Sequence, residues 1–136
     1  MLTRSLQIIQ NKVARVVTRC DWYTPAATVL HQCGWLSVHQ LVFYHSVLII
    51  YKVKLNRTPK YLDNMFNWSY QYPTRQAESG QIKMEGRPRL ELSKNSFRWR
   101  AAEQFNQLPA DIRNSTSLQT FKLKAKTWIK NNISFQ

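Results

Sequence analysis

The stretch that decides the fold is LSVHQLVFYHSVLIIYKVKLN, residues 36–56. Read as a helix, it is apolar on nearly every side, through Val38, Leu41, Val42, Phe43, Val47, Leu48, Ile49, Ile50, Val53 and Leu55. A helix of a soluble domain that is apolar all round must be covered by other elements on most sides. Ser37 is the expected N-cap. We therefore expect residues 38–55 to form a central buried helix.

A membrane span is the alternative interpretation of the same stretch. A span needs about 20 predominantly apolar residues. Polar residues interrupt this run and lysines close it, at His39, Gln40, His45, Ser46, Lys52 and Lys54. We therefore favour the buried helix and expect no membrane partner.

Amphipathic segments on both sides of the central stretch supply the expected cover. Residues 4–19 form the first predicted helix, with a buried stripe made of Leu6, Ile9, Val13, Val16 and Val17. Residues 118–132 form the last, with a stripe made of Leu118, Phe121, Ala125, Trp128 and Ile129. A third runs over 97–108, where Phe97, Ala101, Phe105 and Leu108 share a face. We expect these three helices to enclose the central one.

Turn and cap residues divide the rest of the chain. Residues 26–33 are expected to form a short helix ended by Gly34, and residues 60–66 one or two helical turns. Asn95 or Ser96 caps the helix at 97, and Ser117 caps the last helix. Residues 81–92 alternate around Glu85-Gly86 and can form a short β-hairpin. The predicted fold is mainly α, a single domain over residues 1–136 with about five helices.

The charge of the chain points to polyanions. Its 136 residues contain 20 Lys and Arg against 7 Asp and Glu, for a formal net charge of +13. The excess is spread along the chain, so it should coat a folded surface and attract nucleic acid. The predicted phosphate-binding residues are Arg4, Lys12, Arg15, Arg19, Arg98, Arg100, Lys122, Lys126 and Lys130. The alternative is that these rows are ordinary solvated helix faces.

Aromatic residues near arginines supply a second candidate contact. Trp68 and Tyr72 lie in a predicted loop near Arg75, and Trp99 stands between two arginines. Aromatic rings can stack on unpaired bases. The alternative is that they pack their own segments onto the core.

Catalytic and metal-binding patterns are missing from the sequence. The acids are scattered, and no phosphate-binding glycine loop occurs. The metal-like residues His31, Cys33, His39 and His45 do not follow a zinc-site spacing. Two cysteines make no disulfide framework, and no secretory signal is visible. We expect no catalytic residue, metal, cofactor or small-molecule substrate, and an intracellular location, either nuclear or cytoplasmic.

Several segments, taken in order, carry a resemblance. They are IQNKVARVVT (9–18), GWLSVHQL (34–41), YHSVLIIYK (44–52), PKYL (59–62), SFRWRAAEQFNQLPADIR (96–113) and SLQTFKLKAKTWI (117–129). In this order and spacing they resemble the thumb and post-palm region, C-terminal to the catalytic core, of non-LTR (LINE-type) retrotransposon reverse transcriptases of the Jockey/CR1-like kind. Phe105 stands where such proteins often have Trp, a change that should preserve packing.

The resemblance implies a helical part of an RNA-directed DNA polymerase that grips RNA or a primer–template duplex. The family's paired-aspartate palm motif is absent here, so we expect no polymerase activity from this chain. The expected function is non-catalytic nucleic-acid binding by a fragment of such a transposable-element enzyme, with RNA or an RNA/DNA duplex as partner. The alternative is a protein–protein module that docks on a reverse-transcriptase catalytic core or on itself.

Overall fold

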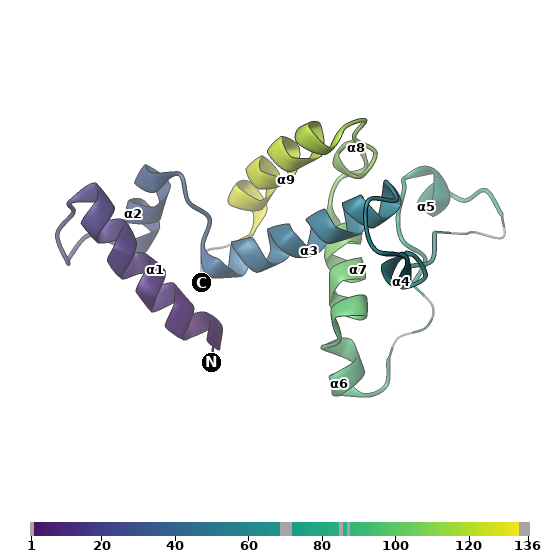
Figure 1. Ribbon diagram of the computed structural model, residues 1–136, viewed down its shortest axis with the longest axis horizontal. Helices are drawn as coiled ribbons and strands as arrows, with labels where there is room; N and C mark the ends of the chain where they lie inside the picture. Colours follow the sequence, from purple (N-terminus) through teal and green to yellow (C-terminus); the bar gives the residue numbers. More distant parts are fainter. Residues whose placement is uncertain (1, 69–71, 85, 87, 134–136) are drawn as a thin grey trace. The chain divides into compact units, whose positions relative to one another are not determined.

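The computed structural model describes residues 2–68, 72–84, 86 and 88–133, and it is mainly helical, as predicted (Figure 1). The helices are α1 (Leu2–Thr18), α2 (Ala26–Cys33), α3 (Val38–Lys54), α4 (Lys60–Asp63), α5 (Arg75–Glu78), α6 (Glu91–Lys94), α7 (Phe97–Gln107), α8 (Ala110–Arg113) and α9 (Leu118–Asn132). The chain divides into two compact units, residues 1–42 with 129–136, and residues 43–128. That both belong to one domain stays a prediction.

The first unit is built on α1 and α2. Ala14 of α1 packs with Val29 and Leu30 of α2 in a small buried cluster. Gly34 ends α2 with a left-handed φ of 68°, and its N–H donates to the carbonyl of His31. Glycine adopts this conformation without a steric penalty, and the predicted helix end is confirmed.

The side of α1 that the structure buries is not the predicted one. Gln7 and Ala14 are buried, whereas the large apolar residues of the helix are between 46% and 78% exposed. Six of them lie on one side, which we call the α1 apolar face: Leu2, Leu6, Ile9, Val13, Val16 and Val17. The prediction of a buried apolar stripe on this helix was therefore wrong.

Hydrogen bonds explain why the polar side of α1 faces inward. Gln7 Oε1 accepts from the backbone N–H of Val38 at 2.8 Å, and Gln10 Nε2 donates to the carbonyl of Leu36 at 2.8 Å. These two glutamines satisfy backbone groups where α3 begins. The first N–H groups of a helix have no partner within it, so such contacts are favourable.

The N-terminus of α3 is closed by a reciprocal capping pair. The backbone N–H of Gln40 donates to Ser37 Oγ, and the N–H of Ser37 donates to Gln40 Oε1 at 2.9 Å. Both residues are buried. This capping box confirms Ser37 as the N-cap.

In the second unit α3 is the buried centre, as predicted. Val47, Ile50 and Tyr51 are almost completely buried. The Tyr51 ring stacks on Phe121 of α9, with centroids 4.1 Å apart and ring planes within 3°. Its hydroxyl donates to the carbonyl of Ser115 at 2.6 Å, so the polar end of this buried ring is satisfied.

Helix α9 buries the stripe that the sequence predicts, and α7 buries most of its own. Ala101, Phe105 and Leu108 are buried, but Phe97, which was predicted on the same face, is 42% exposed at the start of α7. Phe121, Ala125 and Ile129 of α9 are fully buried, and the other two members of that stripe are half-buried. The caps also match, since Ser96 and Ser117 each accept a backbone N–H from the residue three positions on. Local rules thus predicted both helices and most of their buried faces, but the predicted burial of Phe97 was wrong.

Arg113 is a buried cation that the sequence did not single out. It is 4% exposed, and its guanidinium donates to the carbonyls of Ser79, Asn106 and Leu108. These carbonyls come from the loop before Gly80 and from the end of α7. A buried charge needs several hydrogen bonds to offset lost hydration. Arg113 therefore ties the loop before Gly80 and the end of α7 to α8.

The hairpin expected near residues 81–92 is not what the structure shows in its described part. Lys83 forms an isolated antiparallel bridge with Asn67, and Glu91 begins α6. Residues 85 and 87, at the expected turn, lie outside the described residues. The alternation of the sequence allowed a hairpin, but residue 83 pairs with an earlier segment, and Pro88 weakens the second strand.

Replacement of Gly80 by alanine should destabilise the protein more than the same change at Gly34. Both glycines have a left-handed φ, 72° and 68°, which costs a non-glycine residue roughly 1–2 kcal/mol. A Cβ at Gly80 would also lie 2.3 Å from Asn114 Oδ1, whereas one at Gly34 meets nothing within 4 Å. Urea unfolding of both variants measures the difference, and equal losses would contradict the packing.

Lys54 should make stability rise with pH. Burial lowers the pKa of Lys54, and the charge of Arg113 lowers it further. The unfolded chain therefore binds this proton more tightly than the folded one, and the folded state gains stability as pH rises through the folded pKa toward 10.5. We expect the free energy of unfolding of the wild type to increase over this pH range relative to that of Lys54→Met, as measured by urea unfolding. A flat or falling difference would count against the burial.

Candidate nucleic-acid interface

The lysines of α9 form a row beside its buried stripe. Lys126 and Lys130 are exposed and Lys122 is half-buried. Residues four apart are neighbours on a helix, so the three ammonium groups follow one another along its surface. The helix contains no Asp or Glu, and within the described part of the chain no acidic side chain pairs with these lysines. We call them the α9 lysine row.

One member of the row is supported by an aromatic ring. Lys126 Nζ lies 5.4 Å from the ring centroid of Tyr44 on α3. Burial raises the pKa of Tyr44, so its hydroxyl stays protonated and its ring uncharged. A cation–π contact of this kind contributes about 0.5–1 kcal/mol at an exposed site. It holds the lysine against the helix while leaving its charge at the surface.

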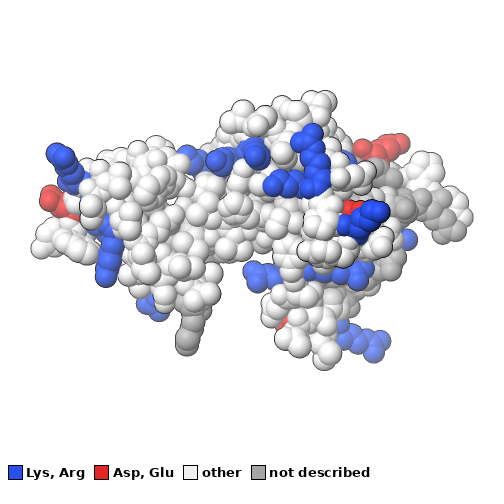
Figure 2. Space-filling model, viewed as in Figure 1, with Lys and Arg blue, Asp and Glu red and all other residues white. Residues whose placement is uncertain are grey.

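In the second unit Lys and Arg residues outnumber Asp and Glu. Figure 2 shows Lys and Arg side chains over α9 and over α7, with few acidic side chains on the face in view. Clustered cations of one sign raise the local concentration of anions at a surface. The two helices that cover α3 therefore present a basic exterior.

The start of α7 brings two predicted residues to one pocket. Arg98 is exposed, Trp99 is half-buried, and both line a cavity of about 440 Å³. Arg100 is exposed as well but does not line the cavity. We call this cavity the Trp99 pocket.

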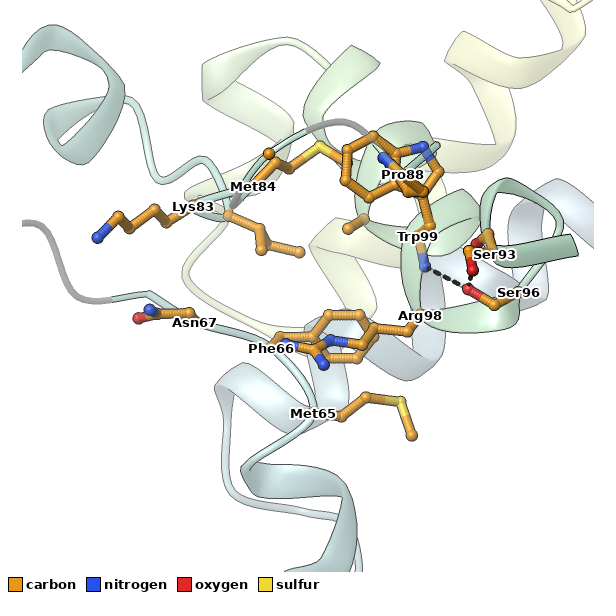
Figure 3. Close-up of a pocket in the computed structure, with 13 residues that line it drawn as sticks. Met65, Phe66, Asn67, Lys83, Met84, Pro88, Ser93, Ser96, Arg98 and Trp99 are labelled. Carbon is orange, nitrogen blue, oxygen red and sulfur yellow. Dashed lines mark hydrogen bonds between the residues drawn. The ribbon is translucent and has the colours of Figure 1, made fainter. Parts of the chain in front are cut away.

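Several segments line the Trp99 pocket (Figure 3). They are residues 65–67 after α4, residues 82–84, Gly86 with Pro88, Ser93 of α6, and the first half of α7 with Ser96 before it. Figure 3 shows Trp99 and Met84 on one side, Met65 and Phe66 on the other, and Lys83 with Asn67 toward one end. The pocket thus combines soft apolar side chains with a cationic end.

Hydrogen bonds to backbone groups, one made by the backbone and two by a side chain, hold these segments in place. The N–H of Lys83 donates to the carbonyl of Asn67 at 2.8 Å. The amide of Asn106 on α7 accepts from the N–H of Ile82 at 2.8 Å and donates to its carbonyl at 3.0 Å. Residues 82–84 are therefore fastened on both sides, which keeps the pocket formed.

Of the other two proposed stacking residues, Trp68 packs inward and Tyr72 does not. The Trp68 ring meets Phe105 edge-on, with centroids 5.6 Å apart, and Lys54 Nζ lies 5.8 Å from its centroid. Trp68 thus packs its own segment onto the core, which was the alternative to base stacking. Tyr72 is 69% exposed, so its ring is accessible to solvent.

The predicted basic residues of α1 lie in the first unit, and they differ in whether their charged groups are free of contacts with the rest of the unit. Arg4 and Lys12 are exposed. Arg15 is held by its own unit, since it donates to the carbonyl of Thr24 and its guanidinium lies 5.5 Å from the Trp22 ring. Arg19 has a φ of 54° beyond the last helical residue, so it leaves the helix face on which it was predicted. Arg4 and Lys12 remain as open cations of this helix.

Lys83 is a candidate contact that sequence reasoning missed. The sequence predicts Lys83 in one strand of a hairpin, but in the pocket its neighbours include residues 65–67 and the start of α7. The basic–apolar alternation of residues 82–84 was a signal, but it does not indicate which segment lies opposite.

Among the described residues, no group of three or more His, Cys, Asp or Glu side chains could hold a metal ion. Within the same ranges, no single helix is both long and apolar enough to cross a membrane. Helices α2 and α3 taken together have the length and composition of a span, but the chain bends by 47° between them.

Comparison with known proteins adds no relative. No protein-family model, no curated protein and no solved structure matches this chain. The resemblance to LINE-type reverse transcriptases therefore stays a prediction from the sequence.

Proposed function

We propose that this chain binds nucleic acid through phosphate contacts of its basic helices, as a non-catalytic fragment of a LINE-type reverse transcriptase. The α9 lysine row is the observation that supports this most directly. It places cations at one-turn intervals on a helix that has no acid to neutralise them. Cations four residues apart repel by a few tenths of a kcal/mol per pair, and an anion lying along the row removes that cost.

The proposed partner is RNA or an RNA/DNA duplex. Lysine contacts to phosphate give affinity and orientation without reading sequence. The exposed Arg98 and Arg100 of α7 add further cations to the second unit, which also contains Lys122 and Lys126. In the proposed parent enzyme, a catalytic core would carry out the chemistry while this chain grips the backbone of the template.

Salt dependence of binding tests the proposal. Each phosphate that a lysine neutralises contributes about −0.9 to the slope of log K against log salt on B-form DNA and about −0.7 on single strands. We expect steep salt dependence on a structured RNA, and Lys126→Gln should reduce the magnitude of the slope by about one phosphate's share. Fluorescence anisotropy over a salt series measures both.

Lys124→Gln is the matched control for this test. Lys124 is exposed on the same helix but lies on the other flank of the buried stripe. It carries the same charge, so its replacement changes the net charge of the protein equally. Absence of binding at low salt, salt-independent binding, or equal slopes for the two variants would contradict a phosphate site on the row.

A specific observation also favours the alternative, a protein–protein module. The α1 apolar face leaves six large aliphatic side chains exposed. Contiguous exposed apolar surface often marks a protein interface. Docking on a catalytic core, or self-association, would cover it.

Sedimentation velocity at several concentrations and at high salt tests the alternative. Val16 is 78% exposed, so Val16→Gln should change the free energy of unfolding by no more than about 0.5 kcal/mol. If the face self-associates, association of the wild type should persist at high salt and weaken in this variant. A monomer under all conditions, or association unchanged by the variant, would exclude self-association through α1.

A further inference from the structure

We propose that the Trp99 pocket receives a single unstacked base of a nucleic-acid strand, with the adjoining phosphate near Lys83 and Arg98. This inference rests on the proposed function and assigns one site within it. It adds a contact to a base, whereas the α9 lysine row is proposed to contact only phosphates. The ligand class is therefore a nucleotide within a single-stranded segment.

The size and lining of the pocket suit a flat aromatic group. Its volume of about 440 Å³ lies within the range of about 300–1,000 Å³ that is usual for small-ligand sites. Trp99, Met65 and Met84 line it, and Trp99 is only half-buried, so part of its ring is left accessible. Indole rings stack on bases, and thioether sulfurs make favourable contacts with aromatic rings.

The charges around the pocket favour an anionic ligand over a neutral one. Arg98 is exposed at the start of α7, and Lys83 lies at the end of the pocket opposite the α7 backbone (Figure 3). A nucleotide carries its phosphate next to its base, so one residue of the strand can reach both the ring and a cation. An arginine can also hold a phosphate with two parallel hydrogen bonds.

The pocket is formed before any ligand binds. Two of its non-helical segments, residues 65–67 and 82–84, are joined by the Asn67–Lys83 bridge, and Asn106 fastens residues 82–84 to α7. Binding therefore does not have to order these segments, and less of the interaction free energy is lost to conformational entropy. A base leaving its own stack loses a few kcal/mol, least when it is already single-stranded.

Two strands that differ only in their bases provide the test. One is a short oligo(dT) strand, and the other is an abasic strand of the same length and phosphate number. Base–aromatic stacking contributes enough for a preference of about fivefold or more. We expect the wild type to bind oligo(dT) at least that much more tightly than the abasic strand, by fluorescence anisotropy.

Substitutions then locate the preference. Trp99→Ala should abolish it, and Trp22→Ala, which removes an exposed tryptophan from the first unit, should leave it unchanged. Arg98→Gln should weaken binding of oligo(dT) more than Arg100→Gln, because only Arg98 lines the pocket although both are exposed on α7. Far-ultraviolet circular dichroism and thermal unfolding verify that each variant is folded. The arginine pair keeps the test valid if Trp99→Ala does not fold.

The outcomes separate this inference from the proposed function. Equal affinity of the wild type for both strands, with steep salt dependence, overturns the base pocket and leaves phosphate binding intact. A preference for oligo(dT) that survives Trp99→Ala, or equal effects of the two arginine variants, also overturns the pocket. Binding of neither strand at low salt overturns the proposed function and this site with it.

Discussion

Coverage of an all-round apolar helix is the constraint on which the second unit depends. Residues of α3 such as Val47 and Ile50 cannot face water, so helices on the other side of the core must supply matching apolar stripes. The parallel stack of Tyr51 on Phe121 is the closest ring contact that joins α3 to α9. Once Phe121 is oriented inward, helical periodicity determines which way the rest of α9 points.

The basic exterior follows from this packing. On α9 the buried stripe occupies one side, so lysines at steps of four residues along its edge remain at the surface. The helix offers no carboxylates to neutralise them. The same residues that close the core thus set up a row of cations, and the proposed phosphate contacts require no further rearrangement of the helix.

Buried polar side chains hold in place the non-helical segments, which helix packing alone does not position. Arg113 donates to carbonyls of the loop before Gly80 and of the end of α7, and Asn106 fastens Ile82 to α7. Each contact satisfies a polar group that would otherwise be buried without a partner, which is costly. These contacts bring residues 82–84 opposite residues 65–67 and so create the Trp99 pocket. The Trp99 pocket therefore depends on two side chains, Arg113 and Asn106, that do not line it.

The sequence by itself determined the helical class, the buried centre of α3, the inward stripe of α9, and the caps at Ser37, Ser96 and Ser117. These depend on periodicity and on hydrogen bonds between residues close in the chain, which local rules describe well. Only the tertiary structure decided which side of α1 is buried, because two glutamines bind backbone groups at the start of α3. It also decided that Lys83 pairs with Asn67, that Trp68 packs on Phe105, and that Arg113 is buried. Each of these depends on a partner outside the local segment, and amphipathic pattern carries no information about which partner that will be.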